Sequence, residues 1–141
     1  MAAPLPLSLC LFTHNEAESV VQCLALLRPF VSEVLLFNFH STDQLLEATQ
    51  PYNVILQTID WTDHFSQLRN LALEQATQPW VLFLNGDEIL TPEGLTCLPE
   101  LLETEAEIIY CRRLNEKRQV EEMLPRLIKK DPTIHFVGHI Y

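Results

Sequence analysis

The sequence predicts a single α/β domain in which helices flank a mostly parallel β-sheet. Short apolar runs alternate with segments whose apolar residues recur at helical spacing, which is typical of parallel sheets with right-handed crossovers. The chain has 141 residues, 48% of them hydrophobic and 20% charged, as expected for one soluble globular domain with its own core. We see no repeat, low-complexity run or linker, so residues 1–141 are treated as one domain.

Apolar runs mark the expected strands. Residues 7–13 and 33–38 are nearly continuous apolar runs, as in strands that are buried on both faces of a sheet. Residues 53–58 alternate between polar and apolar side chains, as a half-buried strand does. The remaining expected strands cover residues 80–84, 107–113, 123–128 and 135–141.

Polar capping residues mark the starts of the expected helices. Asn15 can cap a helix over residues 16–28, and Ser41-Thr42-Asp43 can begin a helix over residues 42–50. A proline directly follows each of these two segments and favours their termination there. Further helical patterns cover residues 63–77 and 92–105.

Composition excludes several classes of binding site. The three glycines, Gly86, Gly94 and Gly138, cannot form a P-loop or a GxGxxG dinucleotide fingerprint, which need several glycines close together. The formal net charge of −10 argues against nucleic acid as a partner, because Lys and Arg must neutralise its phosphates. Basic residues gather in residues 112–141, a strip that suits an anionic ligand or peripheral contact with membrane lipid headgroups, or is simply a solvated face.

The cysteines and the N-terminal residues indicate a cytoplasmic protein. The four cysteines show no CxxC spacing, and Cys10 and Cys23 lie within apolar patterns, as buried free thiols do. The first residues carry no Lys or Arg and only a short apolar run, which fits neither a signal peptide nor a membrane-spanning helix. We therefore expect a reducing, cytoplasmic environment.

Polar residues follow each of the first four expected strands. In an open parallel sheet the carboxyl ends of the strands form one edge, and ligands bind outside that edge. We therefore expect the polar clusters to converge on a single functional edge. They are Thr13–Glu16, Asn38–Asp43, Asp60–His64 and Asn85–Glu88.

The fourth cluster is the most informative candidate site. Asn85 and Asp87 follow a buried strand, and Gly86 between them allows a sharp turn. Their side-chain oxygens suit Mg²⁺ or Mn²⁺, which could bridge a diphosphate. The alternative is a plain β-hairpin, for which Asn-Gly between apolar runs is a strong signal. The preceding strand does not alternate and Thr91-Pro92-Glu93 begin a helix, which favours the metal site.

Taken in order, these motifs resemble the family-2 glycosyltransferases of GT-A fold, especially a branch with an N-terminal NEE motif and an STD motif. The resemblance covers nearly the whole chain. It implies a three-layer, Rossmann-like GT-A fold that binds a nucleotide-sugar donor, above all a UDP-sugar, and transfers the sugar to an acceptor. The matching segments are Asn15-Glu16, Ser41-Thr42-Asp43, Trp61 with Asp63-His64-Phe65-Ser66 and Arg69-Asn70, Asn85-Gly86-Asp87-Glu88, Pro125-Arg126-Leu127 and Val137-Gly138-His139-Ile140.

The resemblance also implies roles for individual residues. The loop of residues 12–16 would lie against the base and ribose of the donor, and Asn38 would read the base. Arg69 would approach the base or the diphosphate. Asp87 together with Asn85 would hold Mg²⁺ or Mn²⁺ on the diphosphate, where the cation neutralises the leaving group. The implied donor site comprises Phe12, Thr13, Asn15, Glu16, Asn38, Arg69, Asn85 and Asp87.

Three positions depart from the family pattern. Asn85 and Asn38 stand where the family has Asp, and His40 stands where it has Gly. Asn85 removes one negatively charged ligand, so weaker metal binding follows. An amide also donates hydrogen bonds where a carboxylate only accepts them, so a changed or lost donor preference follows. One alternative is therefore a non-catalytic GT-A-like domain used for binding or assembly. A second is an acidic receiver-like signalling module in which Asp87 is the strand-end carboxylate.

The family pattern continues beyond the last residue of this chain, so we expect a domain truncated at its C-terminus. Residues 5–95 correspond to the donor-binding half and residues 96–141 to part of the acceptor side. The family's catalytic base would follow the Gly138 segment, so we assign no catalytic residue. An incomplete domain is expected to expose an apolar edge, which favours pairing into a homodimer.

Overall fold

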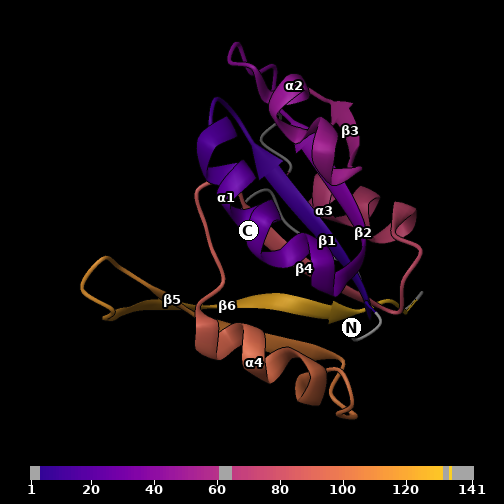
Figure 1. Ribbon diagram of the computed structural model, residues 1–141. Helices are drawn as coiled ribbons and strands as arrows, with labels where there is room; N and C mark the ends of the chain where they lie inside the picture. Colours follow the sequence, from indigo (N-terminus) through magenta and orange to yellow (C-terminus); the bar gives the residue numbers. More distant parts are fainter. Residues whose placement is uncertain (1–3, 61–64, 132–133, 135–141) are drawn as a thin grey trace.

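The structure of the chain, a computed structural model, describes residues 4–60, 65–131 and 134. A six-stranded sheet runs through it in the order β3-β2-β1-β4-β6-β5 (Figure 1). The first four strands are parallel, and β6 pairs antiparallel with both β4 and β5. The predicted mostly parallel sheet is confirmed. The strands are β1 (Leu5–Thr13), β2 (Val31–Asn38), β3 (Ile55–Thr58), β4 (Trp80–Asn85), β5 (Ile108–Leu114) and β6 (Val120–Lys129).

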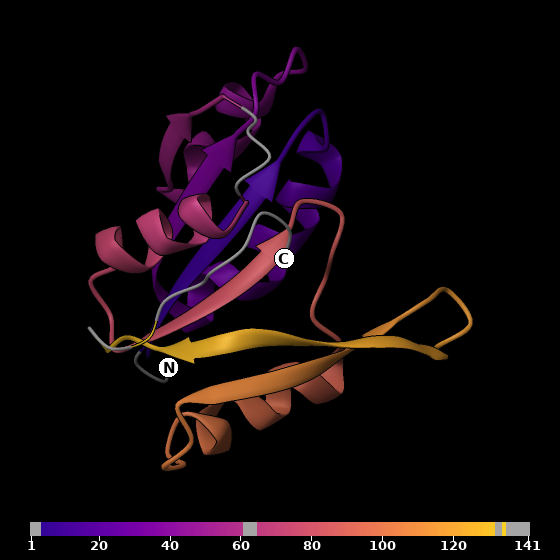
Figure 2. The same cartoon turned by 180° about the vertical axis from the view of Figure 1, so that it is seen from behind.

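Helices cover both faces of the parallel strands and so create three layers. Two opposite views show α1, α2 and α4 on one face of the sheet and α3 on the other (Figures 1 and 2). The helices are α1 (Ala17–Leu27), α2 (Leu45–Thr49), α3 (Phe65–Gln75) and α4 (Pro92–Leu101), with the short 3-10 helices η1 (Arg28–Phe30) and η2 (Gln50–Tyr52).

Successive residues of β1 belong to two separate hydrophobic cores. Leu9 packs into the core on the α1 side, whereas its neighbour Cys10 packs into the core on the α3 side. Every residue of the segment 7–13 is buried, which explains the continuous apolar run in the sequence. Burial raises the pKa of the Cys10 thiol, and it raises the pKa of Cys23 to about 12. Both are buried free thiols, as predicted.

Two described helix boundaries differ from the predicted ones by three residues or more. α2 begins at Leu45 instead of covering residues 42–50, because the polar triplet before it is engaged in a contact with another loop. α4 ends earlier than the predicted 92–105. The predicted strand over residues 135–141, and residues 61–64 ahead of α3, lie outside the described residues.

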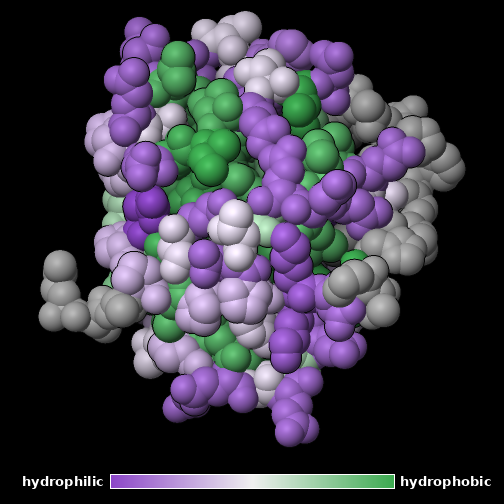
Figure 3. Space-filling view, turned by 90° about the vertical axis from the view of Figure 1, so that its right-hand side faces the viewer, coloured by the Kyte–Doolittle hydropathy of each residue, from purple (hydrophilic) through white to green (hydrophobic). Residues whose placement is uncertain are grey.

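The two edges of the sheet differ in how their side chains are covered. α4 packs on one face of the β5–β6 hairpin, and on the other face Ile128 of β6 reaches the core on the α3 side (Figure 2). At the opposite edge, where β3 lies, hydrophobic side chains gather between hydrophilic ones (Figure 3). Ile55 on β3 and Leu46 on α2 are both more than half exposed. Among the described residues, no helix is long and apolar enough to cross a bilayer.

Candidate functional site

The carboxyl ends of the parallel strands are joined to one another by backbone hydrogen bonds. The Phe39 N–H donates to the Thr13 carbonyl at 2.9 Å, and the Gly86 N–H donates to the Phe12 carbonyl at 2.8 Å. On the other side of β2, the Ile59 N–H donates to the Asn38 carbonyl at 2.9 Å. The polar clusters that follow β1, β2 and β4 therefore meet at one edge, as the sequence predicts.

A pocket of about 470 Å³ opens at this edge. The ring of Phe12 lies 5.0 Å from that of Phe65 and 6.4 Å from that of Phe39, so three aromatic rings supply its apolar wall. Apolar walls with a few polar groups are typical of small-molecule sites. The pocket is lined by Phe12, Thr13, His14, Glu16, Phe39, Phe65 and Asn85.

Four of the predicted donor-site residues line this pocket: Phe12, Thr13, Glu16 and Asn85. The sequence-based assignment did not include His14, Phe39 or Phe65. The sequence did contain a signal for two of them. Phe39 and Phe65 lie in otherwise polar segments that follow strands, and an aromatic ring in such a position needs a packing partner or a ligand.

Arg69 is buried beside the pocket and does not line it. The side chain is only 5% exposed. Its guanidinium carbon lies 4.8 Å from the centre of the Phe65 ring and 5.9 Å from that of Phe83, within the range of cation–π contacts. Arg69 therefore places a positive charge directly behind the aromatic wall.

Asn15 does not cap α1, so that prediction is wrong. Its backbone has a φ of 52°, and its side-chain carbonyl accepts hydrogen bonds from the N–H groups of Thr42 at 2.6 Å and Asp43 at 3.3 Å. Asp43 in turn accepts from the Ala17 N–H at 3.0 Å, so it caps α1 from the neighbouring loop. Ser41 Oγ accepts from the Asn15 N–H at 2.9 Å.

These reciprocal bonds tie the loop after β1 to the loop after β2. We call Asn15, Ser41, Thr42 and Asp43 the loop clip. The clip is formed by the polar side chains of two motifs. The sequence predicts Asn15 as a helix cap and Ser41-Thr42-Asp43 as the start of a helix. The clip fixes the two loops that flank the pocket, and Asn15 does not line the pocket itself.

Asn38, at the end of β2, is nearly buried and turned toward its own loop. Its Oδ1 accepts from both the N–H of Ser41, at 3.0 Å, and the hydroxyl of Ser41. Its Nδ2 lies 3.5 Å from Thr58 Oγ1 on β3. An Asp at this position would keep the acceptor role toward Ser41, and Thr58 would have to donate to it instead of accepting from it.

The segment from Asn85 to Glu88, here called the 85–88 turn, packs directly against β1. A Cβ atom on Gly86 would lie 2.5 Å from Thr13 Oγ1 and 2.8 Å from Glu16 Oε1. Glycine is therefore required for close approach. The turn leads into α4, and the antiparallel partner of β4 is the distant β6, so the hairpin alternative is excluded.

The oxygen atoms on the 85–88 turn are the candidate cation ligands. Asp87 is exposed and Asn85 is half-buried, so both side chains are accessible. Glu88 is not available in the same way, because Arg126 and Arg113 lie against its carboxylate, at 2.6 Å and 3.6 Å. Within the described ranges, no three His, Cys, Asp or Glu side chains gather as a metal centre.

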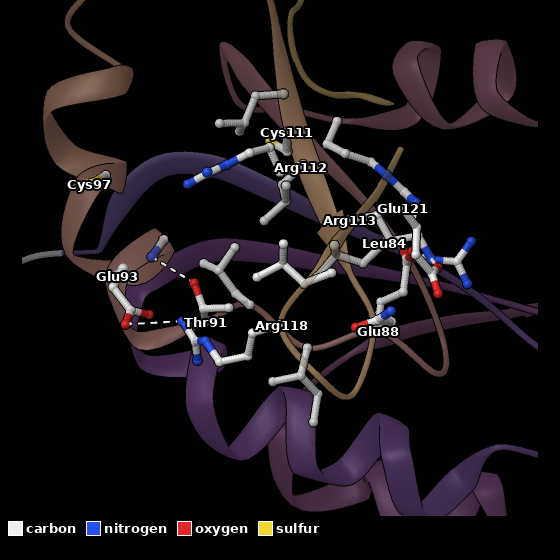
Figure 4. A pocket seen from close by; sticks show the side chains of 18 of the residues that line it. Leu84, Glu88, Thr91, Glu93, Cys97, Cys111, Arg112, Arg113, Arg118 and Glu121 are labelled. Carbon is white, nitrogen blue, oxygen red and sulfur yellow. Dashed lines mark hydrogen bonds and ion pairs between the residues drawn. The ribbon is translucent and has the colours of Figure 1, made fainter. Parts of the chain in front are cut away.

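A larger groove of about 970 Å³ lies on the other side of the 85–88 turn, between α4 and the β5–β6 hairpin (Figure 4). Asp87 lines this groove, whereas Asn85 lines the smaller pocket, so the turn separates the two. Burial raises the pKa of the Cys111 thiol in its wall. Across the groove mouth, Arg118 pairs with Glu93 at 3.2 Å.

Three arginines of the hairpin, Arg113, Arg118 and Arg126, are engaged with carboxylates. A hydrogen bond from its own backbone, followed by the contact with Arg118, lowers the pKa of Glu93. The hydrogen bond to Glu122 raises the pKa of Arg113, which also faces Glu88 and Glu121. The basic strip seen in the sequence is thus partly neutralised by neighbouring acids.

Comparison with known proteins shows the same fold in nucleotide-sugar enzymes. A model of the family described as Glycosyl transferase family 2 matches residues 8–137. TarS of S. aureus (residues 1–349) superposes with a TM-score of 0.63 at 22% identity, over 84% of this chain and 39% of that chain. The mannosyltransferase PcManGT from Pyrobaculum calidifontis, in complex with GDP-Man and Mn²⁺, gives 0.55 at 22% identity, over 79% and 38%. Glucosyl-3-phosphoglycerate synthase from Mycobacterium tuberculosis, in complex with Mn²⁺, UDP and glucosyl-3-phosphoglycerate, gives 0.56 at 15% identity, over 79% and 45%.

Two curated relatives extend well beyond this chain. A TPR repeat-containing protein of Synechococcus elongatus is 33% identical over 139 residues, which are 96% of this chain and 34% of that protein. The lipopolysaccharide core biosynthesis glycosyltransferase LpsC of Rhizobium meliloti is 30% identical over 117 residues, 79% of this chain and 43% of that protein. The chain thus spans less than half the length of each. The six-stranded sheet and the family match both argue against the receiver-like alternative.

Proposed function

The chain belongs to glycosyl transferase family 2, and from this premise we propose that it forms the donor-binding part of a glycosyltransferase that uses a nucleoside diphosphate sugar. The observation that carries the proposal is the pocket at the carboxyl ends of β1, β2 and β4. A nucleobase needs an apolar wall and a few hydrogen-bonding groups. Phe12, Phe39 and Phe65 supply the wall, and Thr13 and Glu16 supply polar groups beside it.

The two cavities suggest how the chain divides its work. Residues 5–95 would bind the donor, above all a UDP-sugar, and residues 96–141 would contribute to the acceptor side, where the larger groove lies. Similar structures hold GDP-Man with Mn²⁺ and UDP with Mn²⁺, which supports a donor of this chemical class. Peripheral membrane association, a homodimer and a cytoplasmic location stay predictions from the sequence.

Individual residues then have distinct roles. Asn38, at the end of β2, would act on the base indirectly, because its side-chain oxygen holds Ser41 in the loop after β2. Arg69 would favour the anionic diphosphate through its charge, which acts strongly because it lies in a poorly solvated layer behind Phe65. Asn15 would act indirectly, because its side chain holds the loop clip together.

The oxygen atoms on the 85–88 turn fit a hard cation that is shared with the substrate. Mg²⁺ commonly binds through one or two carboxylates and the phosphates of its substrate. Asp87 would supply the carboxylate and Asn85 an amide oxygen, while Glu88 is engaged by arginines. The bound Mg²⁺ or Mn²⁺ would neutralise the charge of the departing nucleoside diphosphate. With one available carboxylate, we expect the cation to bind together with the nucleotide and only weakly alone.

Titration calorimetry with UDP, in the presence and absence of Mn²⁺, tests this function. We expect binding that strengthens when Mn²⁺ is present, loss of that gain in Asp87→Ala, and a larger gain in Asn85→Asp. Asp60→Ala is the matched control. Asp60 is an exposed carboxylate at the same sheet edge, and within the described residues its ion pair is with His40. Absence of heat at millimolar UDP with Mn²⁺ would overturn the proposal.

A further inference from the structure

A nearly buried ion pair connects β6 to the 85–88 turn. Arg126 on β6 is 5% exposed, and its Nη2 donates to Glu88 Oε2 at 2.6 Å. The side chain of Glu88 is itself only 13% exposed. Removing two charges from water is costly unless they are paired and hydrogen-bonded. Each of these charges therefore explains the burial of the other.

The remaining contacts of the pair return to β4 and to the backbone of the turn. Arg126 Nη1 donates to the carbonyl of Phe83 at 3.3 Å. Glu88 Oε1 accepts from the Asn85 N–H at 2.8 Å, and the Glu88 N–H donates to the Asn85 carbonyl at 3.0 Å. The chain of contacts starts on β4, passes through β6 and ends at the residue that begins the turn. The two ends of the turn, Asn85 and Glu88, are thus bonded to each other and to Arg126, and Asp87 lies between them in the sequence.

We propose that Glu88 and Arg126 are positioning residues, which fix the backbone of the 85–88 turn and with it the two candidate cation ligands, Asn85 and Asp87. This inference rests on the proposed function, since it concerns the same cation. Glu88 directly follows Asp87, and its sequence position alone would make it a candidate ligand. Its two carboxylate oxygens are instead occupied by the turn backbone and by Arg126. Contacts of this kind orient metal ligands and contribute to metal affinity.

Arg113 on β5 is a second, outer partner of the same carboxylate. Its Nε lies 3.6 Å from Glu88 Oε2, and its Nη1 donates to Glu122 at 2.9 Å. The side chain is 40% exposed, so water screens its attraction to Glu88. Figure 4 shows Glu88 and Arg113 toward one side of the groove and Glu93 with Arg118 toward the other. The second pair is therefore a natural control.

The test combines nucleotide binding with amide exchange of the turn. In Glu88→Ala we expect the Mn²⁺-dependent affinity for UDP to fall about 10-fold or more, with the affinity for UDP alone unchanged. Hydrogen–deuterium exchange of residues 84–90 in the ligand-free protein should become faster. Arg126→Met should behave like Glu88→Ala, because Glu88 then loses its buried partner. Glu93→Gln removes an exposed ion pair at the same groove, and we expect no change in either measurement.

Glu88→Gln separates the contact of Glu88 with the turn backbone from its contact with Arg126. It is the decisive variant if Glu88→Ala fails to fold. It keeps an oxygen that can accept from the Asn85 N–H but loses the charge that pairs with Arg126. The Mn²⁺-dependent affinity of Glu88→Gln for UDP should lie between those of wild type and Glu88→Ala. If Glu88→Ala does not fold, the affinity of Glu88→Gln should still be lower than that of wild type. Wild-type affinity and exchange in folded Glu88 variants would overturn the inference and leave the proposed function intact. A wild-type protein that does not bind UDP in the presence of Mn²⁺ would overturn the proposed function, and unchanged exchange in the Glu88 variants would then overturn the hold on the turn as well.

Discussion

Side chains are more completely buried in the parallel half of the sheet than in the antiparallel β5–β6 hairpin. In β1, all residues from Leu7 to Thr13 are buried, because helices cover both faces. In β5, exposed and half-buried residues alternate, and α4 covers one face only. Tyr110 and Met123 on the hairpin are both more than half exposed.

The difference shows where a precise site can be placed. Backbone hydrogen bonds join the loops after β1, β2 and β4, and the loop clip also joins the first two. Several independent contacts therefore fix the positions of these loops. The hairpin contributes a single nearly buried polar side chain to this edge among the described residues, Arg126. Regions with few buried apolar contacts open more readily, so we expect the hairpin to be the less stable half.

The largest predicted effect compares a buried residue of the parallel half with an exposed residue of the hairpin. Leu9→Ala in β1 should lower the free energy of unfolding by about 3 kcal/mol, because it removes fully buried methyl groups and leaves a cavity. Met123→Ala in β6 should change it by less than about 0.5 kcal/mol, since that side chain is 53% exposed. Urea unfolding of both variants measures the difference. Equal losses would show that the hairpin is as tightly packed as the parallel half.

The next effect concerns the two described glycines. Gly86→Ala should cost about 1–3 kcal/mol, because the new methyl group overlaps Thr13 and forces β1 and the turn apart. It should also weaken UDP binding, since Thr13 lines the pocket. Gly94→Ala in α4 is the control: its new methyl group would meet the flexible end of Leu90 at 3.1 Å. Thermal unfolding with matched UDP titrations would contradict the prediction if both variants behaved alike.

The loop clip should contribute less than either of these. Asp43→Ala removes the acceptor for the first N–H of α1 and should cost about 1 kcal/mol, as loss of a helix cap does. Asn15→Gly keeps a residue that tolerates the positive φ and removes only the side-chain contacts, so it isolates their effect. Because the two residues share one network, the double variant should lose less than the two single losses combined. Full additivity in chemical denaturation would mean that the two loops are independent.

The smallest effect is expected at the exposed pair of Glu93 and Arg118. Glu93→Gln should leave the thermal midpoint at pH 7 almost unchanged, because water screens both charges. Its lowered pKa fixes the sign of any effect: the contribution is present above the ordinary value of 4.5 and disappears as the pH falls below it. Midpoints of wild type and variant measured at pH 7 and at pH 3 should therefore converge at the lower pH. A difference between the two midpoints that grows from pH 7 to pH 3 would contradict the stabilising role of the Glu93 charge.

Much of the fold follows from local pattern, and much of the site does not. Continuous apolar runs predicted β1, β2 and β4 because strands buried on both faces must be apolar throughout. Polar residues at strand ends predicted the functional edge, since parallel strands point their carboxyl ends the same way. The side-chain partners could not be predicted in this way. Asn15 has the composition of a helix cap, yet Asp43 from the next loop caps α1.

The sequence by itself determined the α/β class, the parallel direction of the first strands and the edge at which the polar motifs meet. Each of these depends on periodicity and on residue type within one segment. Only the tertiary structure decided that Gly86 serves close approach to Thr13, that Asn15 and Asp43 join two loops, and that Glu88 turns toward Arg126. These contacts join residues that lie between 26 and 73 positions apart, and Glu88 and Arg126 are 38 positions apart. Local patterns specify which groups must be satisfied, but the packing of distant segments selects the partner that satisfies them.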